Sequence, residues 1–210
     1  MSDYKLTPWG YKVNSDIIPD LMNEVEFINF TNGKFASSDT RIGPNIASAS
    51  AAIRNFCGWH IAPSLPCAML YNVADLRDAF VNGDLLIQLP ATFVTNVSKV
   101  MLDDEVVNSD RIDYGMGDGL VRIYDVGGLD RRSKVYIEYD AGFPDTSISD
   151  IKELVASGVT RALTNSFGVA SEAAGGVSIS YSSTWSGKGS TALANDARQT
   201  LDAYKAKGVF

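Results

Sequence analysis

Apolar residues recur every three or four positions between residues 42 and 57, which is the spacing of one face of an α-helix. This stripe consists of Ile42, Ile46, Ala49, Ile53 and the pair Phe56 and Cys57. Pro44 fits the first turn of the helix, where a backbone N–H is not needed. Gly58 accepts a left-handed backbone without steric strain, so we expect the helix to end there.

The preceding residues give a shorter helical pattern. Apolar spacing predicts a short amphipathic helix or a pair of turns built on Ile17, Ile18, Leu21, Val25 and Ile28. Asn32 and Gly33 form a turn signal that should end it.

Between about residues 65 and 143 the apolar period changes from 3.6 to 2, which is the spacing of a β-strand. Val121 and Ile123 alternate with polar neighbours, as do Val135, Ile137 and Tyr139. Turn sequences separate these runs at residues 82–84, 103–105, 115–119 and 127–128. The pattern predicts an antiparallel β insert.

The last third returns to helical spacing. Ser147 and Asp150 predict a capped helix whose apolar stripe consists of Ile151, Leu154, Val155, Val159, Ala162 and Leu163. Alternating Val177, Ile179 and Tyr181 then predict an exposed extended arm, and Leu193, Ala197, Leu201 and Tyr204 share one face of a final helix. The chain is therefore expected to be α+β, with a helical core, an inserted antiparallel β subdomain and a C-terminal extended arm plus helix.

The predicted organisation has three parts. Residues 1–64 form an N-terminal helical part, residues 65–143 the β insert, and residues 144–210 the C-terminal helices and arm. The two helical parts are expected to pack as one core. A chain of 210 residues is long enough to bury such a core.

The formal charge of −7 argues against a protein that coats nucleic acid, because neutralising phosphates requires clustered cations. The first residues lack the apolar run of a signal peptide, and no run of about 18 apolar residues predicts a membrane span. The sequence therefore predicts a protein made in the cytoplasm. Two cysteines, Cys57 and Cys67, are too few for a disulfide framework and are expected to be buried thiols.

Candidate chemistry is sparse. His60 is the one histidine, so a Cys–His mechanism would have to pair it with Cys57, which lies on the apolar stripe of a helix. A zinc site could use Cys57, His60, Cys67 and a distant Asp75, but the second close pair of ligands is missing. Packing roles explain these residues better, and no cofactor is expected.

Two glycine-rich segments and one acidic segment have ordinary explanations. Residues 187–191 lack the hydroxyl residue that must follow the lysine of a phosphate loop. Gly115, Gly117 and Gly119 lie between strand patterns, which predicts a hairpin turn. The acids at 103–105 and Asp110 lack the ligand spacing of a calcium loop and predict a solvated turn.

Several segments, in order, resemble one family. They are IASASAAIRNFCGWHI (residues 46–61), LLIQLPATFVTNVSKVMLDDEVV (85–107), VYIEYDAGF (135–143), GGVSISYSSTW (175–185) and the terminal LDAYKAKG. Together they resemble the head–tail connector proteins of tailed bacteriophages, which are also called adaptor or head-completion proteins. Residues 1 to about 24 match no part of that pattern.

The resemblance implies a structural virion protein with no catalytic residues. It implies a dodecameric ring in the neck, bound to the portal protein on one side and to a tail-proximal stopper protein on the other. The double-stranded DNA would pass through this ring without tight binding.

A ring needs two different complementary surfaces on each subunit. We expect residues 175–210 to reach out of the monomer and to supply an assembly interface made by Val177, Ile179, Tyr181, Trp185, Leu193, Leu201 and Tyr204. Two other classes of function remain open. A ligand- or carbohydrate-binding β module would need Tyr114, Tyr124 and Tyr136 to line one pocket. A small hydrolase would need carboxylates that converge in a cleft.

Overall fold

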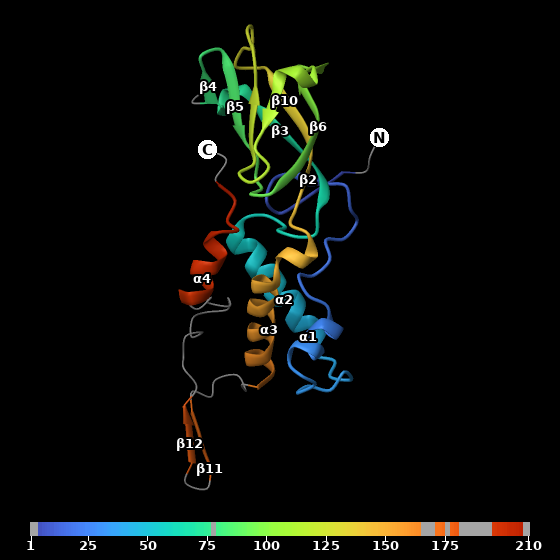
Figure 1. Ribbon diagram of the computed structural model, residues 1–210, viewed down its shortest axis with the longest axis vertical. Helices are drawn as coiled ribbons and strands as arrows, with labels where there is room; N and C mark the ends of the chain where they lie inside the picture. Colours follow the sequence, from blue (N-terminus) through green and yellow to red (C-terminus); the bar gives the residue numbers. More distant parts are fainter. Residues whose placement is uncertain (1–3, 77–78, 165–170, 175–176, 181–194, 208–210) are drawn as a thin grey trace. The chain divides into compact units, whose positions relative to one another are not determined.

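The computed structural model describes residues 4–76, 79–164, 171–174, 177–180 and 195–207 (Figure 1). It contains helices and antiparallel sheets, so the predicted α+β class is confirmed. The chain divides into two compact units. Unit 1 consists of Met1–Pro19, Cys57–Ser147 and Tyr204–Phe210, and unit 2 consists of Asp20–Phe56 and Ile148–Ala203.

The prediction that the N-terminal part is helical is wrong for its first residues, which contain two strands. Strands β1 (Lys5–Leu6) and β2 (Lys12–Val13) pair with each other, and β2 also pairs with β3 (Leu65–Asn72). Strands β1 and β2 have only two residues each, which is too short for apolar alternation to be recognised in the sequence. The β unit therefore includes the N-terminal segment as well as the predicted insert.

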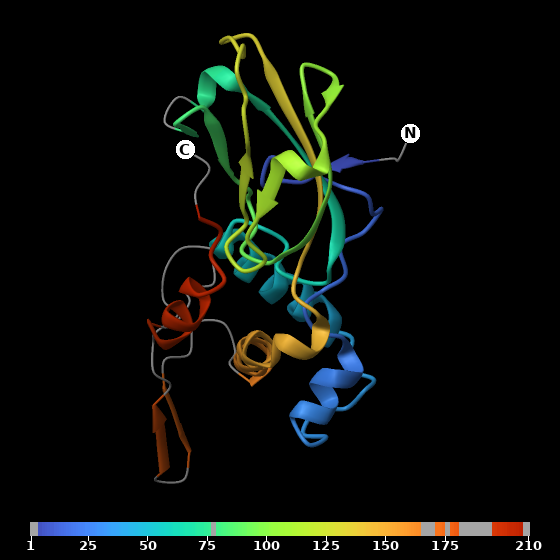
Figure 2. The same cartoon turned by 45° about the horizontal axis from the view of Figure 1, so that its top comes forward.

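Unit 1 contains two antiparallel sheets (Figures 1 and 2). The six-stranded sheet has the order β1-β2-β3-β10-β6-β7, and the four-stranded sheet has the order β4-β5-β9-β8. The remaining strands are β4 (Phe80–Val81), β5 (Asp84–Gln88), β6 (Val94–Leu102), β7 (Glu105–Val106), β8 (Ile112–Tyr114), β9 (Leu120–Ile123) and β10 (Lys134–Ala141).

The inner faces of the two sheets supply one apolar core. Val135, Ile137 and Tyr139 alternate along β10 as buried residues, as the period-2 pattern predicts. Leu85 and Ile87 of β5 are also buried. The Tyr71 hydroxyl on β3 donates to the Gln88 carbonyl on β5 (3.1 Å), which ties one sheet to the other.

The predicted turns are confirmed. Asn82 and Gly83, between β4 and β5, both have positive φ (55° and 92°), as a two-residue hairpin turn requires. Asp103 and Asp104 do the same between β6 and β7, with φ of 48° and 69°. Gly142 follows β10 at φ 128°, where an added Cβ would lie 2.2 Å from the Pro63 carbonyl oxygen. Only glycine fits this position.

Unit 2 is built on α2 (Ile42–Cys57), which has Pro44 in its first turn. Gly58 follows at φ 78°, so the predicted end of this helix is confirmed. Ile42, Ile46 and Ile53 are buried, as the stripe predicts. A Cβ placed at Gly158 on α3 (Ser149–Thr164) would lie 4.0 Å from the Ala49 Cβ, so small residues let α2 and α3 approach closely.

The other helix boundaries differ from the prediction. Helix α1 (Glu24–Phe30) begins later than the apolar pattern indicated, because Asn23 and Glu26 form a capping box there. Helix α3 begins at Ser149, since the Ile148 carbonyl accepts the first helical bond, from the Lys152 N–H. Ile148 rather than Ser147 therefore holds the N-cap position. Lys152 also pairs with Glu26 (2.6 Å).

The C-terminal segment contains a β-hairpin and a helix. Strands β11 (Ser171–Ala174) and β12 (Val177–Ser180) pair antiparallel, so the predicted arm is a hairpin along this stretch rather than a single extended strand. Helix α4 (Asn195–Asp202) contacts α3. Within the described residues, no helix is long and apolar enough to cross a membrane.

Candidate assembly surface

His60, the residue on which any histidine chemistry would depend, is held in the core of unit 1. The Tyr11 hydroxyl lies 2.7 Å from His60 Nδ1 and accepts the His60 backbone N–H at 3.0 Å. Nε2 faces the carbonyl oxygens of Ala141 (2.9 Å) and Pro63 (3.1 Å). Carbonyls only accept, so the network assigns the proton to Nε2 and makes the Tyr11 hydroxyl a donor to Nδ1. Both ring nitrogens are thus used in structural bonds.

The two cysteines lie in the apolar interior. Both are buried and neither forms a disulfide. Burial raises the pKa of the Cys67 thiol to about 12, whereas a nucleophile or zinc ligand must be a thiolate. Asp75 accepts a hydrogen bond from Asn72 instead (3.1 Å). Across the described part of the chain, no three His, Cys, Asp or Glu side chains are grouped as metal ligands.

Asp103 and Asp104 form a turn and residues 115–119 connect two strands, as predicted, whereas Glu105 lies on β7 and Asp110 lies in a short 3-10 helix (Ser109–Arg111). The Asp103 carboxylate accepts the Lys134 backbone N–H (2.7 Å), which fixes the β6–β7 turn against the start of β10. Gly115 to Gly119 connect β8 with β9. Residues 187–191 lie outside the described residues.

The tyrosines required by the ligand-binding alternative do not face the same way. Tyr136 lies on β10 of the six-stranded sheet, with its side chain opposite to that of the buried Val135. Tyr114 on β8 is directly paired with the buried Val121 of the other sheet, so it lies on that sheet's inner face. Tyr124 stacks under Arg122 (4.9 Å from guanidinium carbon to ring centroid). They do not line one pocket.

The outer face of the six-stranded sheet carries a continuous apolar row across four strands. Each pair in this row is directly opposed: Leu70 with Tyr136, Tyr136 with Met101, and Met101 with Val106. Leu70 is 53% exposed and Val106 is 64% exposed, while the two central residues are half-buried. We call these four residues the outer row.

Charged residues border the outer row. On the same face, Glu138 of β10 is directly opposed to Lys99 of β6, and Lys12 of β2 is opposed to Ala68. Tyr136 donates to Glu138 (3.1 Å), and burial together with this bond raises the pKa of Tyr136 to about 12, so its phenol stays neutral. An apolar strip with a charged border is typical of a protein interface.

The sequence-predicted interface residues lie elsewhere. Leu201 is 0% exposed, and the Tyr204 ring packs edge-on against Phe143 (5.1 Å between centroids). The Tyr204 carbonyl accepts the Trp59 indole N–H (2.6 Å). Leu201 is therefore a core residue, and the prediction that the whole of residues 175–210 leaves the monomer is wrong for residues 195–207. Val177 and Ile179 lie on β12. Tyr181, Trp185 and Leu193 lie outside the described residues.

Sequence reasoning missed the outer row, although a signal was present. Residues 68–71 and 100–102 are uninterrupted apolar runs within strands. Because neighbouring side chains on a strand point to opposite faces, such runs place apolar groups on the outside as well as in the core.

Comparisons with known proteins add no assignment. No protein-family model matches this sequence, and no match was found among curated proteins.

Proposed function

We propose that this chain is a structural subunit of a bacteriophage neck, a head–tail adaptor that forms a ring between the portal protein and the tail-proximal stopper. In this role the chain is not an enzyme and uses no cofactor. Its subunits are made in the host cytoplasm and assemble, as a dodecamer, into the virion. The subunit combines a helical unit with an antiparallel β unit that includes the N-terminal strands, together with a C-terminal hairpin and helix.

The outer row carries this proposal. Leu70 and Val106, at the two ends of the row, expose apolar side chains on this sheet face. Such a face gains free energy when a partner covers it, at roughly 25 cal/mol per Å² of apolar area. The resemblance to connector proteins supports a ring as the assembly, and the structural role of His60 agrees with a function other than catalysis.

Replacing the ends of the outer row should prevent assembly without unfolding the chain. Leu70→Lys with Val106→Lys places two ammonium groups where a partner would bury apolar surface, so self-association should weaken about tenfold or more. Met116→Lys is the matched control, because Met116 is 58% exposed in the β8–β9 turn. Light scattering and negative-stain imaging, with and without portal particles, measure assembly. Unaltered protein that forms no ring under either condition would overturn the proposed function.

The proposed ring should surround DNA without gripping it. With a formal charge of −7, the isolated protein is expected to give no saturable duplex binding in a mobility-shift assay, even at low salt. Tight binding that weakens steeply as salt rises would contradict a passive channel wall.

A further inference from the structure

The six-stranded sheet of unit 1 ends in two short strands that present apolar side chains to solvent. Within the described residues, β1 forms one edge of this sheet and β7 forms the other. Leu6 on β1 is 71% exposed, and Val106 on β7 is 64% exposed. An edge strand also carries backbone donors and acceptors with which another strand can pair.

The backbone groups of Val106 point away from the sheet. The Val107 N–H donates to the Val100 carbonyl (2.9 Å), which makes these two residues a hydrogen-bonded pair. The adjacent pair, Met101 with Val106, is then a non-hydrogen-bonded pair, because the two kinds alternate along an antiparallel ladder. In such a pair the N–H and C=O of each residue point away from the partner strand. Those of Val106 therefore lie along the outer edge of β7.

Leu6 holds the equivalent position at the opposite edge. The Thr7 N–H donates to the Tyr11 carbonyl (2.8 Å), so these two residues are a hydrogen-bonded pair. The adjacent pair, Leu6 with Lys12, is therefore non-hydrogen-bonded. The N–H and C=O of Leu6 point away from β2 and lie along the outer edge of β1.

The side chains of Leu6 and Val106 point to the same face of the sheet. Val106 belongs to the outer row. Strand pairing leads from Leu6 through Lys12 and Ala68 to Glu138, and Glu138 lies two residues from the outer row along β10. Directly opposed residues share a face, as do residues two apart on one strand. Leu6 is therefore on the outer face as well.

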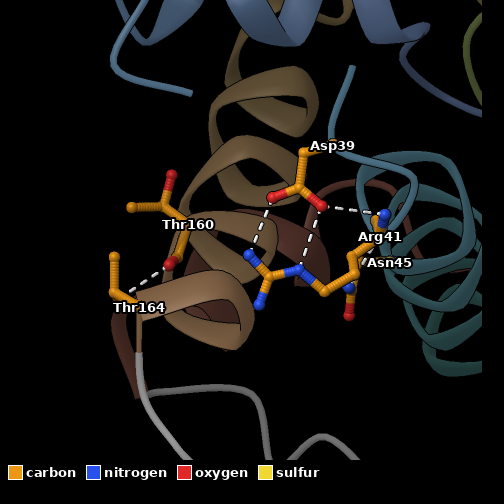
Figure 3. Close-up of polar contacts among 5 residues, drawn as sticks. All are labelled: Asp39, Arg41, Asn45, Thr160 and Thr164. Atoms are coloured by element: carbon orange, nitrogen blue, oxygen red, sulfur yellow. Dashed lines mark hydrogen bonds and ion pairs between the residues drawn. The ribbon is translucent and has the colours of Figure 1, made fainter. Parts of the chain in front are cut away.

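Charged side chains of unit 2 form ion pairs within the chain. Figure 3 shows the Arg41 guanidinium forked onto Asp39, with Nε 3.0 Å from Oδ1 and Nη2 2.7 Å from Oδ2. The hydrogen bonds from Arg41 lower the pKa of Asp39 to about 2, so this pair stays ionised at neutral pH. Lys152 pairs with Glu26 (2.6 Å). Because such pairs are already complete in one chain, the sheet edges are the better basis for a contact between copies.

We propose that β7 of one copy of this chain pairs with β1 of the next copy, so that the six-stranded sheets of neighbouring subunits join edge to edge. All neighbouring strands of this sheet are antiparallel, so β1 and β7 run in opposite directions. A sheet continued head to tail therefore makes them an antiparallel pair. With Leu6 opposite Val106, the two residues exchange both backbone hydrogen bonds, and their side chains meet on the outer face.

The contact extends the outer row by one residue, since Leu6 of the next copy lies beside Val106. Lys5 already pairs with Asp16 (2.6 Å), so the contact depends on backbone groups and apolar side chains rather than on charge. β1 and β7 are different surfaces, which makes the contact heterologous, the kind that can close a ring. This inference rests on the proposed function and names the two surfaces through which ring neighbours meet.

Proline substitution tests the hydrogen bonds at each edge. Val106→Pro and Leu6→Pro each remove an N–H that points out of the sheet, where edge strands tolerate proline, so both variants should fold. Ring formation should fall about tenfold or more, because one hydrogen bond is lost and a carbonyl of the next copy is left without its donor. Val106→Ala and Leu6→Ala are the matched controls. They shorten the side chain but keep the N–H, so they should reduce ring formation less than proline does.

Disulfide cross-linking tests which edges meet. In a hydrogen-bonded antiparallel pair the two Cα atoms are about 5.5 Å apart, which a disulfide can span. A one-to-one mixture of Leu6→Cys and Val106→Cys chains should therefore form disulfide-linked dimers on oxidation with copper phenanthroline, whereas each variant alone should not. The native Cys57 and Cys67 are buried and should not compete. A mixture of Leu6→Cys with Met116→Cys is the control, because Met116 is exposed in the β8–β9 connection.

Negative-stain imaging and light scattering measure ring formation, and circular dichroism verifies folding. Rings that persist undiminished in the proline variants would overturn the edge contact and leave the proposed function intact. The same holds if Leu6→Cys chains cross-link with one another as well as they do with Val106→Cys chains. If a proline variant does not fold, the cross-linking result decides alone. Unaltered protein that never self-associates would overturn both proposals.

Discussion

Deleting residues 183–210 should abolish cooperative folding rather than only assembly. The deletion removes Leu201, and losing a fully buried leucine side chain costs about 2 to 5 kcal/mol. It also removes the Tyr204 carbonyl, which leaves the Trp59 indole N–H without that acceptor, at about 1 to 3 kcal/mol. The Cys57 carbonyl loses its bond from the Ala206 N–H (2.8 Å) as well. Together these losses compare with the total stability of a typical domain, about 5 to 15 kcal/mol.

Urea unfolding followed by circular dichroism measures this effect. Leu201→Ala should lower the free energy of unfolding by about 2 to 5 kcal/mol, whereas Gln199→Ala, at an exposed position of α4, should change it by less than about 0.5 kcal/mol. A truncated chain with a sharp transition at the original midpoint would show that α4 and Tyr204 do not contribute to the folded core.

Two buried tyrosines should respond in opposite ways when the hydroxyl is removed. Tyr11→Phe deletes the donor to His60 Nδ1 and the acceptor of the His60 N–H, so it should destabilise unit 1 by about 2 to 4 kcal/mol. Tyr139 is equally buried, but its hydroxyl has no hydrogen-bond partner among the described residues. Tyr139→Phe removes a polar group that was desolvated without compensation, so it should be neutral or stabilising by about 1 kcal/mol.

The two variants control for each other, since both change tyrosine to phenylalanine in the same core. Equilibrium urea unfolding gives the difference in free energy between them. Equal destabilisation by both, or a larger loss for Tyr139→Phe, would contradict the bonding pattern described for His60.

The sequence by itself determined the elements whose signals are local. The α2 stripe and Gly58, the alternation along β10 and the hairpin turns at residues 82–83 and 103–104 each depend on a few neighbouring residues. In those cases the backbone conformations that a residue can adopt and the spacing of apolar residues are compatible with few local structures. The packing role of His60 was also inferred from sequence, because it followed a helix-ending glycine and had no partner motif.

Only the tertiary structure shows the features that require contacts between residues far apart in the sequence, namely strand pairing, burial and the outer row. Strands β1 and β2 join the sheet only because β3 offers an edge, and two-residue strands carry no period of their own. The apolar spacing of Leu201 is the same whether its side chain faces a partner or the core. Its burial in the folded chain shows that it faces the core. The outer row lies on four strands spread over residues 65–106 and 134–141, and only the pairing register aligns Leu70, Tyr136, Met101 and Val106. Side chains from separate segments become a surface only when long-range pairing sets their register, and apolar periodicity within one segment cannot supply that information.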